Sequence, residues 1–426
     1  MLLLGVLLLS GGCDRSPAAE HRPVTIRFWN GFTGPDGRTM LALVRRFNHE
    51  NPDVHVVMQR MDWGTYYNKL FVAGLGGRSP EVFVVHTDSL RRFVGAGLVR
   101  PVDDLVSAAG LDVSDIDANV WSAVEHGAAH YAVPLDIHLL GMYYNRRLFA
   151  AAGIDGPPTN RTEFIDALRR LKKDQDNDGR PEQWGFVFTW MRTNCYTLIR
   201  QNGADLFSPD GARATLDDPK AIEAIRFASD LIRTERLAPG PENFDAWIGF
   251  RQGRVGIVFE GIYMLPELQR QTDLDFGAAA VPSLFDSPAA WCNSHNLCLR
   301  KGLSPQEEAA AMRFVKFLSD NSLDWSAGGQ VPVRRSLRES PDFRAERRFE
   351  AQRAFATQIP HAAYMPAVPF VFEYLVEFDL AIEQSLRGSV PPAQSLPAAQ
   401  ARIERIIARY RDAGALPAEV AAGPQP

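Results

Sequence analysis

Cysteine is scarce in this sequence. The chain holds 4 cysteines in 426 residues. The three beyond its N-terminal region, Cys195, Cys292 and Cys298, are an odd number for a disulfide framework. We expect all three to be buried as small hydrophobic side chains, and they carry no functional signal.

The chain also lacks a strong excess of positive or negative charge, and it lacks long apolar runs. The 46 Lys and Arg residues and the 51 Asp and Glu residues leave a net charge of -5, and no basic stripe points to a nucleic acid as partner. After the first residues, no apolar run approaches the roughly 18 residues needed to span a bilayer. A hydrophobic content of 46% with 23% charged residues is typical of a soluble globular protein, and the length predicts two or more folding units.

The first 13 residues, MLLLGVLLLSGGC, are different. An apolar run from Leu2 to Leu9 is followed by small residues and Cys13, which is typical of a secretory signal. The pattern resembles the lipobox of bacterial lipoproteins, although no Lys or Arg precedes the run and Ser10 stands where Leu is usual. An uncleaved anchor or a plain signal peptide is the alternative. We predict a signal peptide with lipobox at 1–13, lipidated at Cys13, and a polar tether at 14–23.

From Val24 the chain alternates between strand and helix patterns. Strands are predicted at 24–29, 54–59, 81–86 and 254–261. Helices are predicted at 38–51, 65–75, 159–173, 218–233, 304–320, 371–387 and 397–411. Asp218 caps one of them, with Pro219 at its first position. The segment WCNSHNLCL (291–299) is predicted as one strand with polar residues embedded in it. The order is that of an α/β fold with ligands beyond the carboxyl ends of the strands.

The segment YAVPLDIHLLGMYYN (131–145) combines a strand pattern with two polar residues in an apolar run. At strand period, Asp136 and His138 share one face. A carboxylate buried without partners costs several kcal/mol. We therefore expect that face to contact a polar partner, a metal ion or a solvent-filled cleft.

Similar polar or aromatic residues stand at the ends of other predicted strands, and we expect all of them at carboxyl ends. They are Trp29 and Asn30, His86 and Asp88, Asp136 and His138, Glu260 and Tyr263, and Asn293 and His295. Asp88 alone is better explained as the cap of the helix that follows. Together, aromatic faces, amides and carboxylates suit a ligand with many hydroxyls and a few apolar patches.

The order of these segments resembles the extracellular solute-binding proteins of bacterial ABC importers, the group that includes maltose-binding protein. The resemblance covers nearly the whole chain after the tether. It rests on residues 24–56, 79–106, 131–164, 250–265 and 328–337. No single motif is specific for this family, but five motifs in the right order are strong evidence for the resemblance.

The resemblance implies two α/β lobes of the periplasmic-binding-protein type, each a mixed sheet flanked by helices, with a cleft between them. By analogy, crossovers fall near Asp115, Pro282 and Pro332. Lobe 1 would comprise 24–115 and 283–332, and lobe 2 would comprise 116–282 and 333–415. The family closes around its ligand by hinge bending. The resemblance further implies a monomer in the cell envelope that is held to the membrane through Cys13. Such a protein would deliver a small solute, such as a sugar, to ABC permease subunits.

Carried over by position, the ligand-binding residues divide between the lobes. Lobe 1 would contribute Trp29, Asn30 and Asp88, and lobe 2 would contribute Asp136, His138, Glu260 and Tyr263. Candidate stacking platforms are Trp63, Trp190 and Trp291. The segment WCNSHNL stands where the family usually has Gly-Gly, so Asn293 and His295 either reach into the site or narrow it. No cofactor, metal or catalytic residue is expected.

Three alternatives stay open. The loop DQDNDGRPEQWG has Asp174, Asp176 and Asp178 at calcium-loop spacing, but Gly185 stands where the bidentate Glu belongs. A plain Asx-rich turn is therefore the alternative to a cation site.

Paired carboxylates would also serve a glycoside hydrolase, although no segment has a nucleophile elbow, a phosphate loop or histidines at zinc spacing. A glycerol phosphodiester would need an arginine, for which Arg334 is the candidate.

Overall fold

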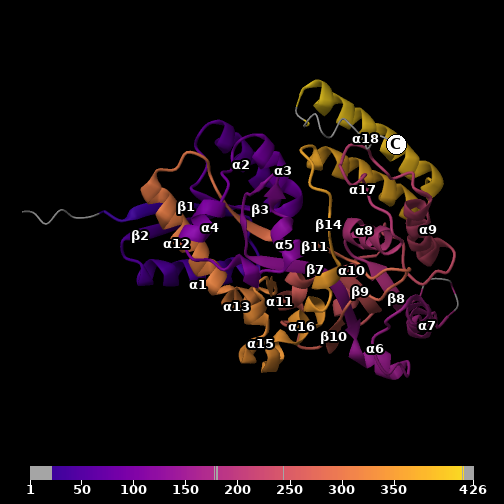
Figure 1. Cartoon of the computed structure of the whole chain (residues 1–426). Helices are drawn as coiled ribbons and strands as arrows, with labels where there is room; N and C mark the ends of the chain where they lie inside the picture. Colours follow the sequence, from indigo (N-terminus) through magenta and orange to yellow (C-terminus); the bar gives the residue numbers. More distant parts are fainter. Residues whose placement is uncertain (1–21, 177, 179–180, 243, 415, 417–426) are drawn as a thin grey trace, which may run out of the picture.

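The computed structural model describes residues 22–414 and 416, apart from 177, 179–180 and 243. Two mixed sheets, each covered by helices, form two lobes that lie side by side (Figure 1). We call them the first and the second lobe. The predicted signal peptide, its Cys13 and most of the tether lie outside the described residues. Within the described part of the chain, no helix combines the length and the apolar character needed to cross a membrane.

The first lobe is built on a five-stranded sheet. Its strands in spatial order are β2 (Val54–Arg60), β1 (Val24–Asn30), β3 (Val82–His86), β12 (His295–Leu299) and β6 (Val133–Pro134). The first three are parallel, whereas β12 is antiparallel to both of its neighbours. Its helices include α1 (Pro35–Glu50), α2 (Trp63–Leu75), α3 (Thr87–Gly95), α4 (Asp103–Ala108), α5 (Ala118–Ser122) and α12 (Pro305–Asp320). The small hairpin of β4 (Glu125–His126) and β5 (Ala129–His130) follows α5.

The second lobe has a sheet centred on a ten-residue strand, β7 (Asp136–Asn145). Its main strand order is β14 (Ala362–Tyr364), β11 (Ala290–Asn293), β7, β9 (Val255–Gly261) and β8 (Trp184–Phe188), and β10 (Phe276–Ala279) and β13 (Val331–Pro332) also pair with β7. Its helices are α6 (Arg146–Ala151), α7 (Arg161–Leu171), α8 (Met191–Gln201), α9 (Pro219–Arg233), α10 (Ala246–Arg251), α17 (Val371–Arg387) and α18 (Pro392–Asp412). Short helices complete the fold: α11 (Leu265–Leu268), α13 (Ser322–Trp325), α14 (Arg335–Arg338), α15 (Pro341–Ala345) and α16 (Glu350–Ala356).

Twice, the chain passes from one sheet to the other at a single residue. Leu135 separates β6 of the first sheet from β7 of the second, and Ser294 separates β11 of the second from β12 of the first. The segment 291–299, predicted as one strand, is therefore two strands in different sheets. We propose these two residues as lobe crossovers, in place of Asp115 and Pro282.

Each lobe has an aromatic core that explains why its helices lie on its sheet. In the first lobe, the ring centroid of Phe314 in α12 lies 5.2 Å from that of Phe28 in β1. In the second lobe, the ring centroid of Phe186 in β8 lies 5.5 Å from that of Phe164 in α7 and 4.8 Å from that of Phe259 in β9. Such ring pairs add to the apolar area that each helix buries. Each lobe therefore has aromatic packing between its sheet and its helices, and one apolar cluster continues from β1 of the first lobe to β9 of the second.

Several local predictions are confirmed and one boundary is wrong. Asp218 caps α9 with Pro219 at its start, and Cys195, Cys292 and Cys298 are buried and free. The last helix, predicted from Pro397, begins five residues earlier, and Pro397 lies inside it. The reason is that Pro392 already occupies the favoured first position of the helix.

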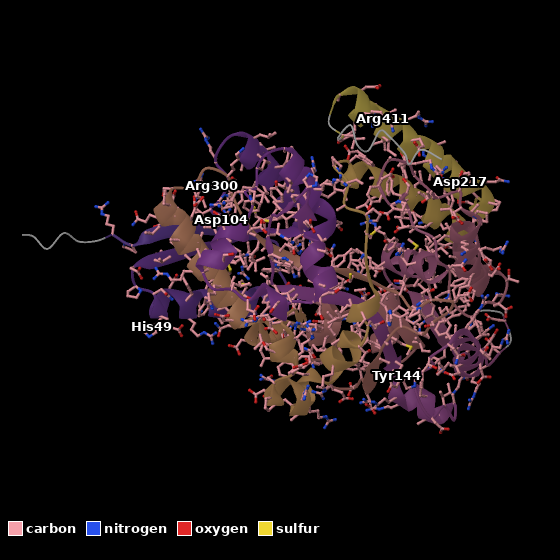
Figure 2. The ribbon with its side chains drawn as sticks, in the orientation of Figure 1. His49, Asp104, Tyr144, Asp217, Arg300 and Arg411 are labelled. Carbon is pink, nitrogen blue, oxygen red and sulfur yellow. The ribbon has the colours of Figure 1, made fainter. Side chains whose placement is uncertain are left out.

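Charged side chains cover the outside of both lobes (Figure 2). The labelled Asp104 and Arg300 lie on the first lobe, and Asp217 and Arg411 on the second. Most ion pairs here are partly exposed, such as Arg100 with Asp104 at 2.7 Å, and pairs of this kind contribute little to stability. The polar groups that need an explanation are the buried ones.

Candidate functional site

Buried polar side chains gather where the two sheets meet. Asp136 and His138 lie at the amino end of β7, and His295 lies at the start of β12. The prediction of carboxyl ends is therefore wrong for these three residues. Antiparallel pairing explains their position, because it puts the start of one strand beside the end of its neighbour: His295 pairs with His86, the last residue of β3.

Asp136 is the centre of this cluster and is fully buried. Its carboxylate accepts hydrogen bonds from His138 Nδ1 at 3.2 Å, His295 Nδ1 at 2.7 Å and Trp325 Nε1 at 2.6 Å. Burial raises the pKa of Asp136, but the interaction with His295 and the hydrogen bonds from both imidazoles outweigh it and hold that pKa well below its ordinary value. Asp136 is thus an anion that orients two imidazoles.

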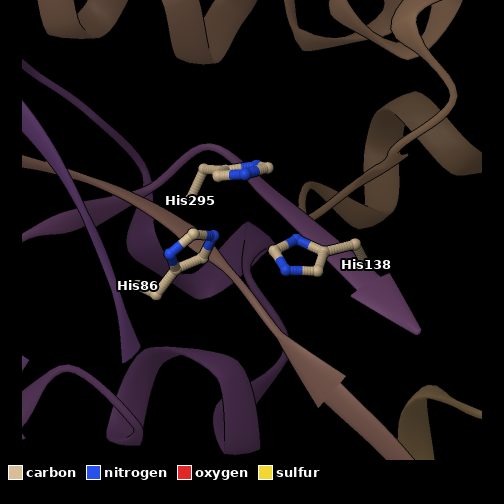
Figure 3. A group of neighbouring side chains, drawn as sticks. All are labelled: His86, His138 and His295. Carbon is tan, nitrogen blue, oxygen red and sulfur yellow. The ribbon is translucent and has the colours of Figure 1, made fainter. Parts of the chain in front are cut away.

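Three histidine rings face one another beside this carboxylate (Figure 3). The ring centroid of His295 lies 4.9 Å from that of His86 and 4.5 Å from that of His138. Burial is the main cause that lowers the pKa of His138 to about 4, and burial also lowers the pKa of His86 well below its ordinary value. The His86 and His138 rings are therefore neutral at pH 7. Trp63 stacks on His295 at 5.8 Å with an interplanar angle of 13°.

A second polar group lies at the end of β9. Glu260 Oε1 accepts hydrogen bonds from Gly261 N at 2.8 Å and Tyr263 Oη at 3.0 Å. Burial outweighs these bonds and raises the pKa of Glu260 to about 7. The ring of Tyr263 lies 6.1 Å from that of His138, so this group adjoins the histidines.

Asp88 and Asn293 link the two lobes. Asn293 Nδ2 donates to Asp88 Oδ2 at 2.9 Å, and Asn293 Oδ1 accepts from Thr87 N at the same distance. The reading of Asp88 as a helix cap is wrong, because α3 begins at Thr87 with His86 in the capping position. Asn293 Oδ1 thus accepts from the first backbone N–H of α3, and Asn293 Nδ2 binds the carboxylate of Asp88.

Three predicted ligand-binding residues have buried polar atoms without a partner in the described part of the protein. These atoms are Asn30 Nδ2, Glu260 Oε2 and Trp291 Nε1. Trp291 is joined to the cluster through its ring, which lies 5.9 Å from that of His138. Buried polar groups normally have hydrogen-bond partners. These atoms are therefore suited to bind a solute that carries both donors and acceptors.

The other two predicted ligand residues stand apart from these contacts. The ring of Trp29 is half-buried and lies under Lys69 Nζ, 5.2 Å from it. Trp190 precedes α8 and is 56% exposed. Among the described residues, no ring contact joins Trp29 or Trp190 to the histidines.

The open alternatives also have a place in the structure. Arg334 is paired with Asp115 at 2.8 Å and Asp320 at 2.5 Å, so its charge is already matched. Asp174, Asp176 and Asp178 lie near one another at the surface, and Gly179 of the same loop lies outside the described residues.

Four residues of the site were not among the predicted ligand residues: His86, Tyr67, Phe32 and Trp325. His86 was recognised only as a polar strand end. Tyr67 Oη lies 2.5 Å from His86 Nδ1, and the ring of Phe32 lies 4.8 Å from those of His295 and Trp325. Tyr67 lies in the helix predicted at 65–75, where an aromatic residue is normally explained as core. Trp325 follows the helix predicted at 304–320 and lies in no predicted element, so no local signal distinguishes either residue.

Comparison with known proteins identifies the family. A model of bacterial extracellular solute-binding proteins matches residues 32–322. The chain belongs to this family. YcjN of Escherichia coli (strain K12), named as an ABC transporter periplasmic-binding protein, is 24% identical over 356 residues, which are 79% of each chain.

Solved structures of the same type confirm the two-lobe periplasmic-binding-protein fold. The sugar-binding protein MalE of Xanthomonas citri has a TM-score of 0.80 at 19% identity, covering 91% of this chain and 98% of that one. UgpB of Mycobacterium tuberculosis, solved with glycerophosphocholine, has a TM-score of 0.78 at 21% identity and covers 91% of this chain and 99% of its own. The predicted resemblance and fold class are therefore confirmed.

Proposed function

We propose that this solute-binding protein captures a neutral, carbohydrate-like solute between its two lobes and delivers it to an ABC permease. The observation that carries the proposal is the set of buried, unpartnered atoms of Asn30, Glu260 and Trp291. The Trp291 ring contacts His138, Glu260 adjoins the cluster through Tyr263, and Asn30 does so through its hydrogen bond with Phe32 N. A polyhydroxylated ligand offers hydroxyls to such donors and acceptors and C–H faces to such rings. We further propose that the protein acts as a monomer, tethered through a lipid on Cys13.

A glycerol phosphodiester is the second candidate, because UgpB of Mycobacterium tuberculosis was solved with glycerophosphocholine. The charges of this chain favour the neutral solute. A phosphate is best held by an arginine fork, and Arg334, the candidate for that role, is engaged by two carboxylates. Arg192 is likewise paired with Asp379.

The geometry gives little support to glycoside hydrolysis. Such an enzyme needs two carboxyl groups, a protonated one that acts as general acid and an ionised one that is free to attack the sugar or to activate water. Glu260, with its raised pKa, suits only the first role. Asp136 uses both of its oxygens for His138, His295 and Trp325. We infer that the protein binds and releases its solute unchanged.

A thermal-shift screen tests the proposed solute class. Purified protein is heated with neutral mono- and oligosaccharides, polyols, glycerol phosphodiesters and amino acids. A ligand at about a thousand times its dissociation constant adds roughly 4 kcal/mol to the free energy of unfolding, which is a rise of several degrees. A shift with neutral sugars alone is the expected result. A shift confined to the phosphodiesters would replace the carbohydrate by the second candidate, and no shift with any class would contradict both.

A further inference from the structure

The three histidines of the cluster come from distant parts of the sequence and meet at the junction of the lobes. His86 ends β3, His138 lies in β7 and His295 opens β12. One ring nitrogen of each lies within 4.8 Å of one ring nitrogen of each of the other two. His86 and His295 belong to the first sheet and His138 to the second. The cluster therefore links both lobes.

The free nitrogen of each ring follows from the hydrogen bonds. His138 Nδ1 and His295 Nδ1 donate to the two oxygens of Asp136, and His86 Nδ1 is paired with Tyr67 Oη. Within the described residues, no hydrogen bond involves Nε2 of any of the three rings. Because Nδ1–H of His138 and of His295 donates to Asp136, Nε2 of these two rings carries a lone pair. Nε2 of His86 carries one in the tautomer in which Nδ1–H donates to Tyr67 Oη.

We propose that His86, His138 and His295 form a binding site for a divalent transition-metal ion, with Zn²⁺ as the best match, coordinated through one ring nitrogen of each. Three neutral imidazoles are a common ligand set for Zn²⁺, with a fourth position left for water or another ligand. A sugar-only site has no need of three convergent imidazoles, two of which share one carboxylate.

The distances fit an ion after small side-chain rotations. An ion at the centre of a triangle with 4.8 Å sides is about 2.8 Å from each corner, and Zn–N bonds are about 2.0–2.1 Å. Each nitrogen thus has to move by less than about 1 Å, within the range of modest χ rotations.

The surroundings have the features that tune metal sites in proteins. A histidine that binds a metal usually donates its other N–H to a carboxylate, which fixes the tautomer and raises the basicity of the ring. Asp136 has this role for two of the rings and is itself held by Trp325. Trp63 and Phe32 pack against the His295 ring and form an apolar wall, which limits access of water. The proposal revises the expectation that the chain has no metal site.

Calorimetric titration of the metal-free protein with Zn²⁺ alone, at pH 7 and without any solute, tests the site. We expect one tight site per chain. His86→Gln, His138→Gln and His295→Gln should each weaken binding by more than about 100-fold, and Asp136→Asn by about 10- to 100-fold, because it no longer orients two ligands. The matched control is His49→Gln, an exposed histidine on the first lobe (Figure 2), which should leave the affinity unchanged.

X-ray absorption at the zinc edge of the wild-type protein keeps the test independent of whether the variants fold. The expected spectrum has three imidazole nitrogens at about 2.0–2.1 Å. Three results would overturn the proposal and mean that the protein binds only an adventitious ion. They are less than one Zn²⁺ per chain, coordination mainly by oxygen, and a loss of affinity in His49→Gln as large as in the variants of the three histidines. Because no solute is present, such a failure leaves the solute-binding proposal standing.

Discussion

Replacing Glu260 by Gln is expected to change how the stability of the protein depends on pH. The Glu260 side chain is fully buried at the end of β9, and burial raises its pKa from 4.5 to about 7. The folded protein therefore holds this proton more tightly than the unfolded chain. The stability contributed by the group is complete below pH 4.5 and is lost as the pH rises through 7.

The size of the effect follows from the two pKa values. One pKa unit corresponds to about 1.4 kcal/mol. Taking 4.5 for the unfolded chain and about 7 for the folded protein, ionisation of Glu260 lowers the free energy of unfolding by about 2.5 kcal/mol between pH 5 and pH 8. A neutral Gln cannot ionise, yet its Oε1 can still accept the hydrogen bonds of Gly261 N and Tyr263 Oη.

The assay is urea unfolding of wild type and Glu260→Gln at pH 5 and pH 8. Between these pH values, the wild type should lose about 2.5 kcal/mol more than the variant. Other titrating groups are common to both proteins and cancel in the difference. Glu339→Gln, at an exposed glutamate, is the control and should follow the wild type. Parallel pH dependences of wild type and Glu260→Gln would refute the reasoning.

Three further substitutions have clear outcomes. Trp325→Phe removes the donor that lies 2.6 Å from Asp136 and should cost about 2 kcal/mol in urea unfolding; an unchanged midpoint would contradict this. Gly185→Ala places a Cβ 2.6 Å from the carbonyl oxygen of Leu168, so it should destabilise by about 1–3 kcal/mol, seen as a lower Tm; an equal Tm would show that α7 can move away. Cys13→Ala should move the protein from the membrane to the soluble fraction of expressing cells, and continued membrane association would exclude the lipid anchor.

The fold was largely predictable because its signals are local. Strand runs such as 24–29 and caps such as Asp218 depend on nearby residues, and the structure has them where the pattern predicts. The division of the segment 291–299 at Ser294 was not predictable, because both halves have the same apolar character. Only the pairing partners, β7 for one half and β3 for the other, separate them.

The site was predictable in its residue types but not in its connections. Asp136 and His138 were paired correctly, because a strand puts alternate residues on one face. The third partner, His295, lies 159 positions from Asp136 in the sequence, and His86 joins through antiparallel pairing with it. Local spacing cannot reveal a histidine cluster of this kind, so the sequence showed no metal motif.

Calorimetric titration with the sugar that responds in the thermal screen, on wild type and Trp291→Phe, tests the central claim most directly. The substitution removes the buried indole donor but keeps an aromatic ring. The proposal predicts weaker binding by about 1–3 kcal/mol, the loss of one buried hydrogen bond, and no change in Trp121→Phe, whose ring stacks on His130 at 4.2 Å. Equal affinity of Trp291→Phe and wild type would contradict a solute bound at this buried donor between the two lobes.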